Sequence, residues 1–333
     1  MKIGLAGAGR IGSMHAEVLA RLDAVSELVL ADVDAERTDL VAAKVGAQSV
    51  PTVPALFEAG LDGIVIAAAT DAHTQLITTA VARGIPVFCE KPVAVDVEGT
   101  LGVIEAVEGS GVPVQVGFQR RFDPGYRQAR AAVGSGRLGW IHTVRSCTLD
   151  AAPPPAVYVR SSGGLYRDCA VHDFDSIRWV TGREIISVYA VGANRGAAFF
   201  ADHDDVDTAS ALLTLDDDTL AVVSCSRYNA AGYDVRLEVL GEKGSVAVGL
   251  DDNAALESAE PGATFPSGVA HAAFPQRFAA AYVAELRAFV HLVQHGGQSE
   301  CTPQDALQAF YAAEACEISR RERRPVSISE VVR

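Results

Sequence analysis

The first 120 residues alternate short apolar runs with amphipathic stretches, and these two patterns predict strands and helices respectively. Short continuous apolar runs indicate strands that are buried on both faces, as in a parallel sheet. The runs cover residues 3–6, 28–31, 63–68, 86–89 and 112–116, with helical patterns between them such as the one over residues 74–83. Strands that alternate with helices predict a doubly wound parallel sheet, whose ligand crevice opens at the carboxyl ends of its strands.

The remainder of the chain changes to apolar–polar alternation between turn residues. Strands are predicted over residues 140–149, 186–191, 209–215, 220–226, 235–240 and 245–248. Helices are predicted over residues 124–133, 165–180, 275–294 and 303–321. This order indicates a large, mostly antiparallel open sheet with helices on one face. We therefore expect an α/β protein of two domains, a Rossmann domain over residues 1–120 and an α+β domain over residues 121–333.

A glycine-rich turn follows the first predicted strand, with Arg10 and Ile11 between its last two glycines. Gly7 allows the turn, Gly9 lets the backbone approach a pyrophosphate, and Gly12 lets the next helix pack on its strand. Free N–H groups at the start of that helix would face the phosphates. An ordinary turn of an α/β protein is the alternative, but the surrounding strand and helix favour a dinucleotide site.

The second predicted strand ends in Asp32, which lies 20 residues beyond Gly12. A carboxylate at this position accepts hydrogen bonds from the adenosine ribose hydroxyls and repels a 2′-phosphate. The sequence therefore predicts NAD as the cofactor.

Polar residues follow two further strand ends. Ala69, Thr70 and His73 come after the strand at residues 63–68, and Glu90 and Lys91 come after the next strand. We expect all five beside the cofactor, because the carboxyl ends of parallel strands line the crevice.

Lys91 is the candidate for binding the reacting oxygen. Pro92 disfavours helical geometry for the lysine, so its side chain is expected to project into the crevice. Its positive charge would bind a substrate hydroxyl and stabilise negative charge on that oxygen. A solvated surface lysine is the alternative reading.

Asp168 and His172 are four residues apart in a predicted helix, so they lie on one face. Gly163 and Gly164 directly before them let the backbone come close to a ligand. A histidine that titrates near neutrality suits a base that removes an alcohol proton, and a nearby carboxylate can orient the substrate or the histidine. An ion pair on a helix surface is the alternative.

A metal site is not expected, although Asp168, His172 and Asp173 are ligand types. A catalytic zinc needs about three convergent ligands with an open position. The other histidines are isolated, and the chain contains no second His or Cys cluster with ligand spacing.

Composition narrows the class of protein. The 333 residues are 49% hydrophobic and carry a formal charge of −14. No stretch approaches the ~18 uninterrupted apolar residues that span a bilayer, and there is no basic stripe for nucleic acid. The six cysteines are scattered without a C-x-x-C pair, which suits reduced thiols. We therefore expect a cytoplasmic enzyme with a small-molecule substrate, and no nucleic-acid or membrane partner.

Several of these segments together resemble a known family. The glycine turn at residues 7–12, the Cys-Glu-Lys-Pro segment at residues 89–92 and the block at residues 163–173 are similar to the glucose–fructose oxidoreductase/inositol dehydrogenase/rhizopine catabolism family. The similarity extends over essentially the whole chain. Residues 117–124 and the proline run at residues 153–155 look most like the inositol 2-dehydrogenase branch.

The resemblance implies NAD(P)-dependent oxidation of a ring hydroxyl. It carries over Lys91, Asp168 and His172 as the catalytic set, with His172 as the acid/base, and all three would contact the substrate. It also implies that the C-terminal domain binds substrate and forms homodimers or homotetramers through its sheet.

The same resemblance places the substrate pocket along Arg121, Asp123 and Tyr233-Asp234. Asp150 stands where close inositol dehydrogenases often carry an Arg or Asn, which alters a polar contact near the substrate. We therefore predict NAD-dependent oxidation of a cyclic polyol, with myo-inositol as the first candidate. Another inositol isomer, a monosaccharide or a keto-sugar is the first alternative, and a non-catalytic NAD(P)-binding sensor is the second.

Overall fold

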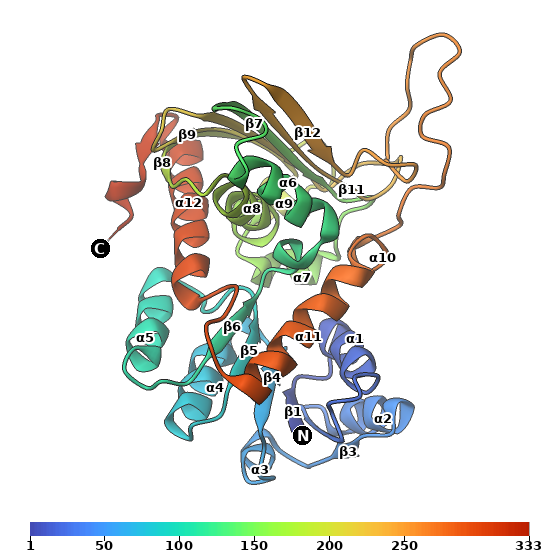
Figure 1. The fold of residues 1–333 in the computed structure, drawn as a ribbon, viewed down its shortest axis with the longest axis vertical. Coiled ribbons are helices and arrows are strands. Elements are labelled where there is room, and N and C mark those ends of the chain that lie inside the picture. Colours follow the sequence, from blue (N-terminus) through green and yellow to red (C-terminus); the bar gives the residue numbers. More distant parts are fainter. Residues whose placement is uncertain (333) are drawn as a thin grey trace. The chain divides into compact units, whose positions relative to one another are not determined.

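The chain forms two units, each built around one sheet (Figure 1). The first unit comprises Met1–Phe122 and Ala280–Leu307, and the second comprises Asp123–Ala279 and the chain from Gln308 onward. The structure is a computed structural model that describes residues 1–332, so Arg333, the last residue of the expected second domain, lies outside the described residues.

The sheet of the first unit is entirely parallel. Its six strands have the order β3-β2-β1-β4-β5-β6, and this order reverses direction between β1 and β4. A reversal of this kind opens a ligand crevice at the carboxyl ends of the two strands. The expected doubly wound sheet is therefore confirmed. Its strands are β1 (Lys2–Ala6), β2 (Glu27–Ala31), β3 (Gln48–Ser49), β4 (Gly63–Ile66), β5 (Val87–Glu90) and β6 (Val114–Gly117).

Helices connect these strands, and polar caps fix where several of them begin. Asp34 and Asp96 accept hydrogen bonds from the backbone N–H groups of the first turns that follow them. The helices of this unit are α1 (Arg10–Leu19), α2 (Ala35–Val45), α3 (Val53–Phe57), α4 (Thr70–Ala82), α5 (Val97–Val107), the 3₁₀ turn η1 (Gln119–Phe122) and most of α11 (Ala279–His295).

Helix α11 returns to the first unit from the C-terminal part of the sequence, which the expected division at residue 120 does not include. It places Leu286, Phe289 and Val290 in the same core cluster as Val65 and Phe88 of the parallel sheet. The apolar stripe of a helix shows that the helix covers a sheet, but the stripe does not show which sheet it covers.

The second unit contains a sheet of seven strands in the order β12-β11-β7-β10-β9-β8-β13. All neighbouring pairs are antiparallel except β7 and β10, which run parallel. The expected mostly antiparallel sheet is therefore confirmed. Its strands are β7 (Ile141–Leu149), β8 (Ile185–Ala193), β9 (Thr208–Leu215), β10 (Leu220–Ser226), β11 (Asp234–Gly241), β12 (Gly244–Val248) and β13 (Val326–Ser327).

Helices lie on one side of this sheet (Figure 1). The strands alternate accordingly: in β10, Ala221, Val223 and Cys225 are buried, whereas Leu220 and Val222 are exposed. The helices of this unit are α6 (Pro124–Gly134), α7 (Ala156–Ser162), the π-helical turn η2 (Tyr166–Ala170), α8 (Val171–Thr181), α9 (Phe199–Asp202), α10 (Phe274–Arg277), most of α12 (Pro303–Glu322) and the 3₁₀ turn η3 (Ile328–Glu330).

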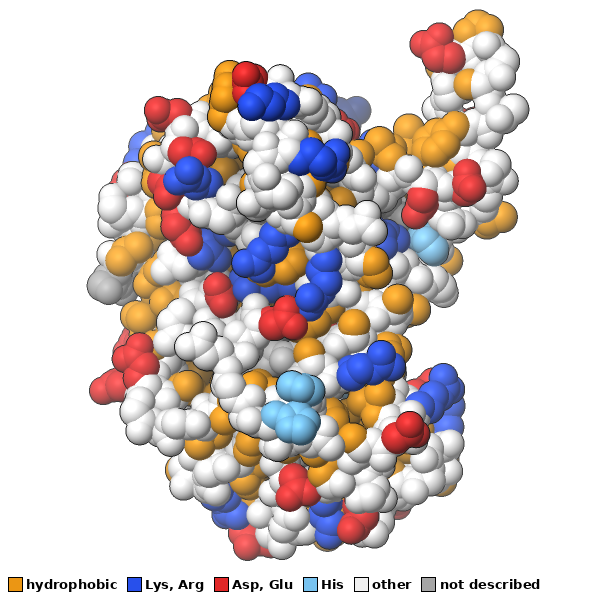
Figure 2. Space-filling view, viewed as in Figure 1, with side chains coloured by type: hydrophobic (Ala, Val, Ile, Leu, Met, Phe, Trp, Pro, Cys, Tyr) orange, Lys and Arg blue, Asp and Glu red, His pale blue; other side chains and the backbone are white. Residues whose placement is uncertain are grey.

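One long segment of the second unit, residues 249–273, contains neither helix nor strand. It stands out from the rest of its unit as the projection at the upper right of Figure 2 and exposes Phe265 and Val269. Over residues 1–332, no helix is both long and apolar enough to span a bilayer.

Candidate active site

The glycine turn after β1 forms an open cradle at the start of α1. Gly7 has a φ of +105°, and a Cβ at this position would lie 2.5 Å from the carbonyl oxygen of Ala67. A Cβ on Gly12 would lie 1.9 Å from the carbonyl oxygen of Gly7, so helix and strand approach each other too closely for any side chain. No atom lies within 4 Å of the Cβ position of Gly9, which leaves the front of the turn open. This shape fits a pyrophosphate resting on the backbone.

Asp32, which follows β2, is held beside this cradle by three hydrogen bonds. Its Oδ2 accepts from the backbone N–H of Ala8 at 2.6 Å, and its Oδ1 accepts from the N–H of Asp34 at 3.0 Å and from Arg37 at 2.8 Å. Partial burial alone would raise the pKa of Asp32, but these hydrogen bonds and the Arg37 charge hold it below its ordinary value. The carboxylate therefore stays ionised as an acceptor, as ribose hydroxyls require.

His73 links the loop after β4 to the turn that carries Lys91. The imidazole is buried, with Nδ1 2.7 Å from the carbonyl oxygen of Pro92 and Nε2 3.1 Å from that of Ala68. Both ring nitrogens therefore face main-chain carbonyls, so His73 acts on the crevice indirectly, by holding the turn that carries Lys91 in place. Ala69 is the N-cap of α4 and Thr70 is its first residue, so both lie at the end of β4 as expected.

Glu90, at the end of β5, is fixed directly before Lys91. Its Oε1 lies 2.6 Å from Nε2 of His15, a residue of α1. Helix α11 adds Glu285, whose side chain is fully buried. Burial, and then the negative charge of Glu90, hold the pKa of Glu285 well above its ordinary value, so the folded protein favours the protonated carboxyl.

In the second unit, Asp168 is the centre of a polar cluster in which Arg227 is buried and the other members are partly exposed. It lies in the π-helical turn η2, directly before α8, where His172 is partly buried. Its Oδ2 accepts a hydrogen bond from Arg227 at 2.7 Å, and its Oδ1 accepts from the hydroxyl of Tyr158 at 2.8 Å. Arg227 also binds Oδ2 of Asp150 at 2.9 Å. The structure therefore brings Asp150 and Asp168 together through one guanidinium.

The charges of this cluster follow from burial and from one another. Burial raises the pKa of Asp150 against the pull of Arg227, and the negative charge of Asp168 adds to the rise. Burial and the Asp168 charge also raise the pKa of Tyr158, which therefore stays a neutral donor. The pKa of Arg227 is raised by its acidic neighbours in spite of its burial, so the guanidinium stays charged.

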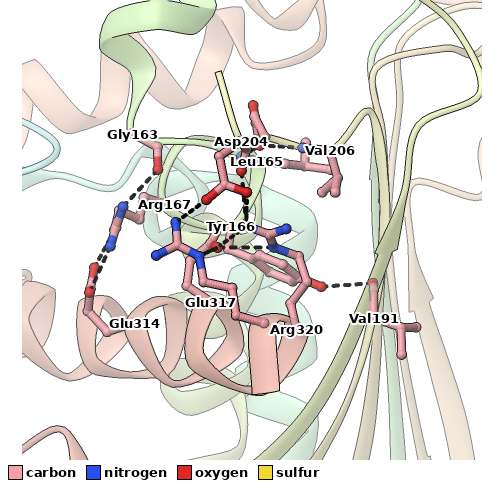
Figure 3. Close-up of polar contacts among 12 residues, drawn as sticks. Gly163, Leu165, Tyr166, Arg167, Val191, Asp204, Val206, Glu314, Glu317 and Arg320 are labelled. Carbon is pink, nitrogen blue, oxygen red and sulfur yellow. Dashed lines mark hydrogen bonds and ion pairs between the residues drawn. The ribbon is translucent and has the colours of Figure 1, made fainter. Parts of the chain in front are cut away.

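The segment that carries Asp168 is anchored to α12 and β8 (Figure 3). Arg167 binds Glu314 of α12 through two of its nitrogens, and the hydroxyl of Tyr166 donates to the carbonyl of Val191 at 2.9 Å. Gly164 has a φ of +93°, and a Cβ there would lie 3.1 Å from Oδ1 of Asp205. The turn before Asp168 therefore requires glycine.

On the sheet side, Asp173 fixes the start of α8. This buried carboxylate accepts hydrogen bonds from the hydroxyls of Ser146 and Thr148, two inward-facing residues of β7. His172 is thus held between a residue bound to the sheet and the turn that contains Asp168.

Comparison with known proteins agrees with this geometry. Residues 1–118 match a family model described as an oxidoreductase family with an NAD-binding Rossmann fold, and residues 126–247 match the GFO/IDH/MocA C-terminal domain. The chain belongs to this family. The resemblance found in the sequence is therefore confirmed.

Similar proteins include several inositol dehydrogenases. The chain is 40% identical to myo-inositol dehydrogenase Hyg17 of Streptomyces leeuwenhoekii over 94% of this chain and 96% of that protein. It is 33% identical to inositol 2-dehydrogenase of Rhizobium meliloti over 99% of both chains. The solved structure of scyllo-inositol dehydrogenase from Lactobacillus casei, with NAD(H) and scyllo-inositol bound, superposes with a TM-score of 0.88 at 30% identity over 99% of each chain.

Two other residues of the expected substrate pocket are held within their own units. Arg121 donates to the carbonyl of Glu300 at 2.8 Å and lies 3.4 Å from Asp305. Tyr233 is buried directly before β11, and its backbone N–H donates to the carbonyl of His271 at 2.7 Å. Their predicted contacts with substrate stay predictions.

Tyr158 and Arg227 are the functional candidates that sequence reasoning missed. Tyr158 lies in α7, where the sequence pattern predicts neither a helix nor a strand. Arg227 directly follows β10, and a charged residue at a strand end is a usable signal. This signal becomes useful only once the pairing of β10 with its neighbours is known. A parallel neighbour ends at the same edge of the sheet, so the residue that follows it lies beside Arg227.

Glu285→Gln should stabilise the protein at neutral and alkaline pH. Above about pH 4.5, the unfolded chain releases the carboxyl proton that the folded protein keeps, so the free energy of unfolding falls as pH rises. The wild type should lose up to ~1.4 kcal/mol per pH unit more than the variant, measured by urea unfolding between pH 5 and about pH 8. Glu36→Gln, at an exposed site, should leave the slope unchanged. Parallel curves for wild type and Glu285→Gln would show that Glu285 is ionised in the folded protein.

Proposed function

We propose that this protein is an NAD-dependent dehydrogenase that oxidises a ring hydroxyl of a cyclic polyol, with myo-inositol as the first candidate substrate. The observation that carries the proposal is the Asp168 carboxylate, whose two oxygens are fixed by Arg227 and Tyr158 one turn before His172. It occurs in a chain that also has a cradle for NAD and is 40% identical to a myo-inositol dehydrogenase. The presence of Lys91 and His172 together with Asp168 favours an enzyme over a sensor, because a sensor needs neither a base nor a cation for the reacting oxygen.

The bound cofactor would rest on the turn at Gly7, Gly9 and Gly12, with Asp32 on the adenosine ribose and Glu90 farther along the crevice. Arg10 and Ile11 would supply backbone N–H groups to the phosphates. NAD supplies the hydride acceptor for the carbon that carries the reacting hydroxyl.

The protein's own residues would move the proton and stabilise charge. We assign His172 as the base that removes the hydroxyl proton, and Lys91 as the cation that stabilises the developing negative charge on oxygen. Asp168 would accept a hydrogen bond from a neighbouring substrate hydroxyl or orient His172. Two carboxylates around one guanidinium leave the cluster with net negative charge, which favours a neutral polyol over a sugar acid or sugar phosphate.

Asp150 supports a second candidate substrate class, another inositol isomer or a monosaccharide. The Asp150 carboxylate offers acceptor oxygens, whereas Arg at this position would only donate and Asn would both accept and donate. The ring hydroxyl that meets this position must therefore be a donor. We also propose a cytoplasmic location, because the six cysteines form no disulfide within residues 1–332 and a reducing compartment suits them.

The outer face of the second sheet supports assembly into homodimers or homotetramers. Tyr189, Leu212 and Val222 are cross-strand neighbours on β8, β9 and β10, and each is more than 40% exposed. Ile186, Val191 and Leu220 add exposed apolar area on the same strands. A sheet that is covered by helices on one face and apolar on the other favours burial against a second copy.

Purified protein with NAD⁺ should oxidise at least one member of a panel of myo-inositol, other inositol isomers and monosaccharides. His172→Asn should lower kcat on the order of 10²-fold or more and remove the acidic limb of the pH–rate profile, because no other group is assigned as base. Lys91→Ala should cost a similar factor while NADH binding is retained. The exposed His203→Asn serves as the control. NADH binding without turnover of any panel member would instead identify a sensor.

Cofactor choice should depend on Asp32. The wild type should prefer NAD over NADP by roughly 30-fold in kcat/KM, about 2 kcal/mol. Asp32→Ser removes the charge beside the 2′ position and frees Arg37 for a phosphate, so the preference should fall or reverse. Asp34→Ser keeps a capping oxygen at the start of α2 and removes only the 3.5 Å ion pair with Arg37, so it should change the preference little. Equal efficiency with both cofactors in the wild type would refute the role of Asp32.

Leu212→Glu should weaken assembly, because it places a charge in the middle of the exposed apolar row on the second sheet. Light scattering at micromolar concentration should give a multiple of the subunit mass for the wild type and a smaller mass for the variant. Leu40→Glu, at an exposed position of α2, should keep the wild-type mass. A monomeric wild type would contradict the proposal.

A further inference from the structure

Arg227 contacts both carboxylates of the cluster around Asp168. We propose that Arg227 is a positioning residue of the active site, which holds Asp150 and Asp168 side by side and orients the Asp168 carboxylate toward the substrate. This inference rests on the proposed function, because it assigns the group that prepares Asp168 for a polyol.

Strand pairing brings the three charged residues together. Asp150 directly follows β7 and Arg227 directly follows β10, and these parallel strands end in register at Leu149 and Ser226. The backbone N–H of Asp150 donates to the carbonyl of Ser226 at 2.8 Å, which keeps the two strand ends together. The pairing of β7 with β10 therefore places the Asp150 carboxylate beside the Arg227 guanidinium. From the end of β10 the guanidinium also reaches Asp168 in η2.

The planar guanidinium suits this bridge. Nη1 lies 2.9 Å from Oδ2 of Asp150 and 2.9 Å from Sγ of Cys169, and Nη2 lies 2.7 Å from Oδ2 of Asp168. The Arg227 side chain is only 4% exposed, so little water is present to replace it. A lysine has one ammonium on a flexible stem and cannot reproduce this fixed fork.

Two like charges need the bridge in order to coexist. The groups that face Asp168 are Tyr158 from α7, Arg227 after β10, Asp150 after β7 and Cys169 beside it, with His172 one turn farther on. Without the guanidinium, Asp150 and Asp168 would share a proton at neutral pH. A protonated Asp168 would donate a hydrogen bond where the substrate hydroxyl needs an acceptor.

The test compares Arg227→Met, Arg227→Lys and the double variant Arg227→Met/Asp150→Asn with the wild type. Arg227→Met should lower kcat by about 10-fold to 10²-fold and move the acidic limb of the pH–rate profile upward by about 1–3 pH units, because turnover then requires Asp168 to lose the shared proton in addition to a neutral His172. Asp150→Asn removes the competing charge, so the double variant should regain about 10-fold in kcat and bring the limb back. Arg227→Lys should fall between Arg227→Met and the wild type. Arg183→Met, which breaks a half-exposed ion pair with Asp217, is the matched control.

Unfolding in urea at several pH values gives a readout that needs neither cofactor nor substrate. Folded Arg227→Met should hold an extra proton that its unfolded chain releases, so its stability should fall more steeply with rising pH than that of the wild type. The double variant should lose this extra slope. A lower kcat with an unmoved acidic limb, no rescue by Asp150→Asn and an unchanged slope would reduce Arg227 to a structural residue. A wild type that oxidises no panel member would refute the proposed function, and the unfolding series would still decide whether Arg227 keeps the two carboxylates ionised.

Discussion

Parallel pairing of neighbouring strands decides where each unit of this protein carries its chemistry. Two parallel strands end at the same edge of a sheet, so the residues that follow them meet there without any long connection. In the first unit this applies to the whole sheet, and it gathers the glycine turn, Asp32, Glu90 and Lys91 at one edge. In the second unit it applies only to β7 and β10, and that pair brings Asp150 to Arg227. The polar cluster of a mostly antiparallel sheet thus forms at its one parallel pair.

The buried carboxylates at these two edges are compensated by different partners. Asp32 stays ionised because backbone N–H groups and Arg37 compensate for its partial burial. Asp150 and Asp168 are compensated by one shared guanidinium, and Tyr158 completes the partners of Asp168. Glu285 faces another carboxylate instead of a cation, and its pKa rises so that it becomes neutral. Removal of one member from an ion cluster of this kind generally costs more than the pair contributes, because a buried charge is left behind.

The sequence predicted the parts of the fold and site that depend on short-range order. The glycine turn, Asp32 at the end of its strand and the positions of most helices and strands follow from local periodicity, and the structure contains them. Periodicity does not show which distant elements pack or pair with each other. It therefore does not predict that α11 returns to the first sheet or that β7 pairs in parallel with β10. Arg227 was missed for that reason, since Asp150 and Asp168 lie 77 and 59 residues away from it. Tyr158 lies only ten residues before Asp168 and was missed because no helix was predicted over α7. The π-helical turn at Asp168 was expected as ordinary helix, because one extra residue in a turn leaves no mark in the apolar pattern.

The bridged cluster also bears on how one polyol is distinguished from another. Inositol isomers differ only in the orientation of single hydroxyls, so discrimination must come from individual hydrogen bonds. A hydrogen bond to a charged group contributes about 1.5–3 kcal/mol, which corresponds to roughly 10-fold to 150-fold in binding. Such a contribution requires that the acceptor be ionised and fixed, since a mobile carboxylate would follow whichever hydroxyl is offered. Asp168 meets this requirement because Arg227 and Tyr158 bind its two oxygens from different elements. In the proposed function, the same constraint that allows two carboxylates to coexist would therefore make Asp168 a selective acceptor.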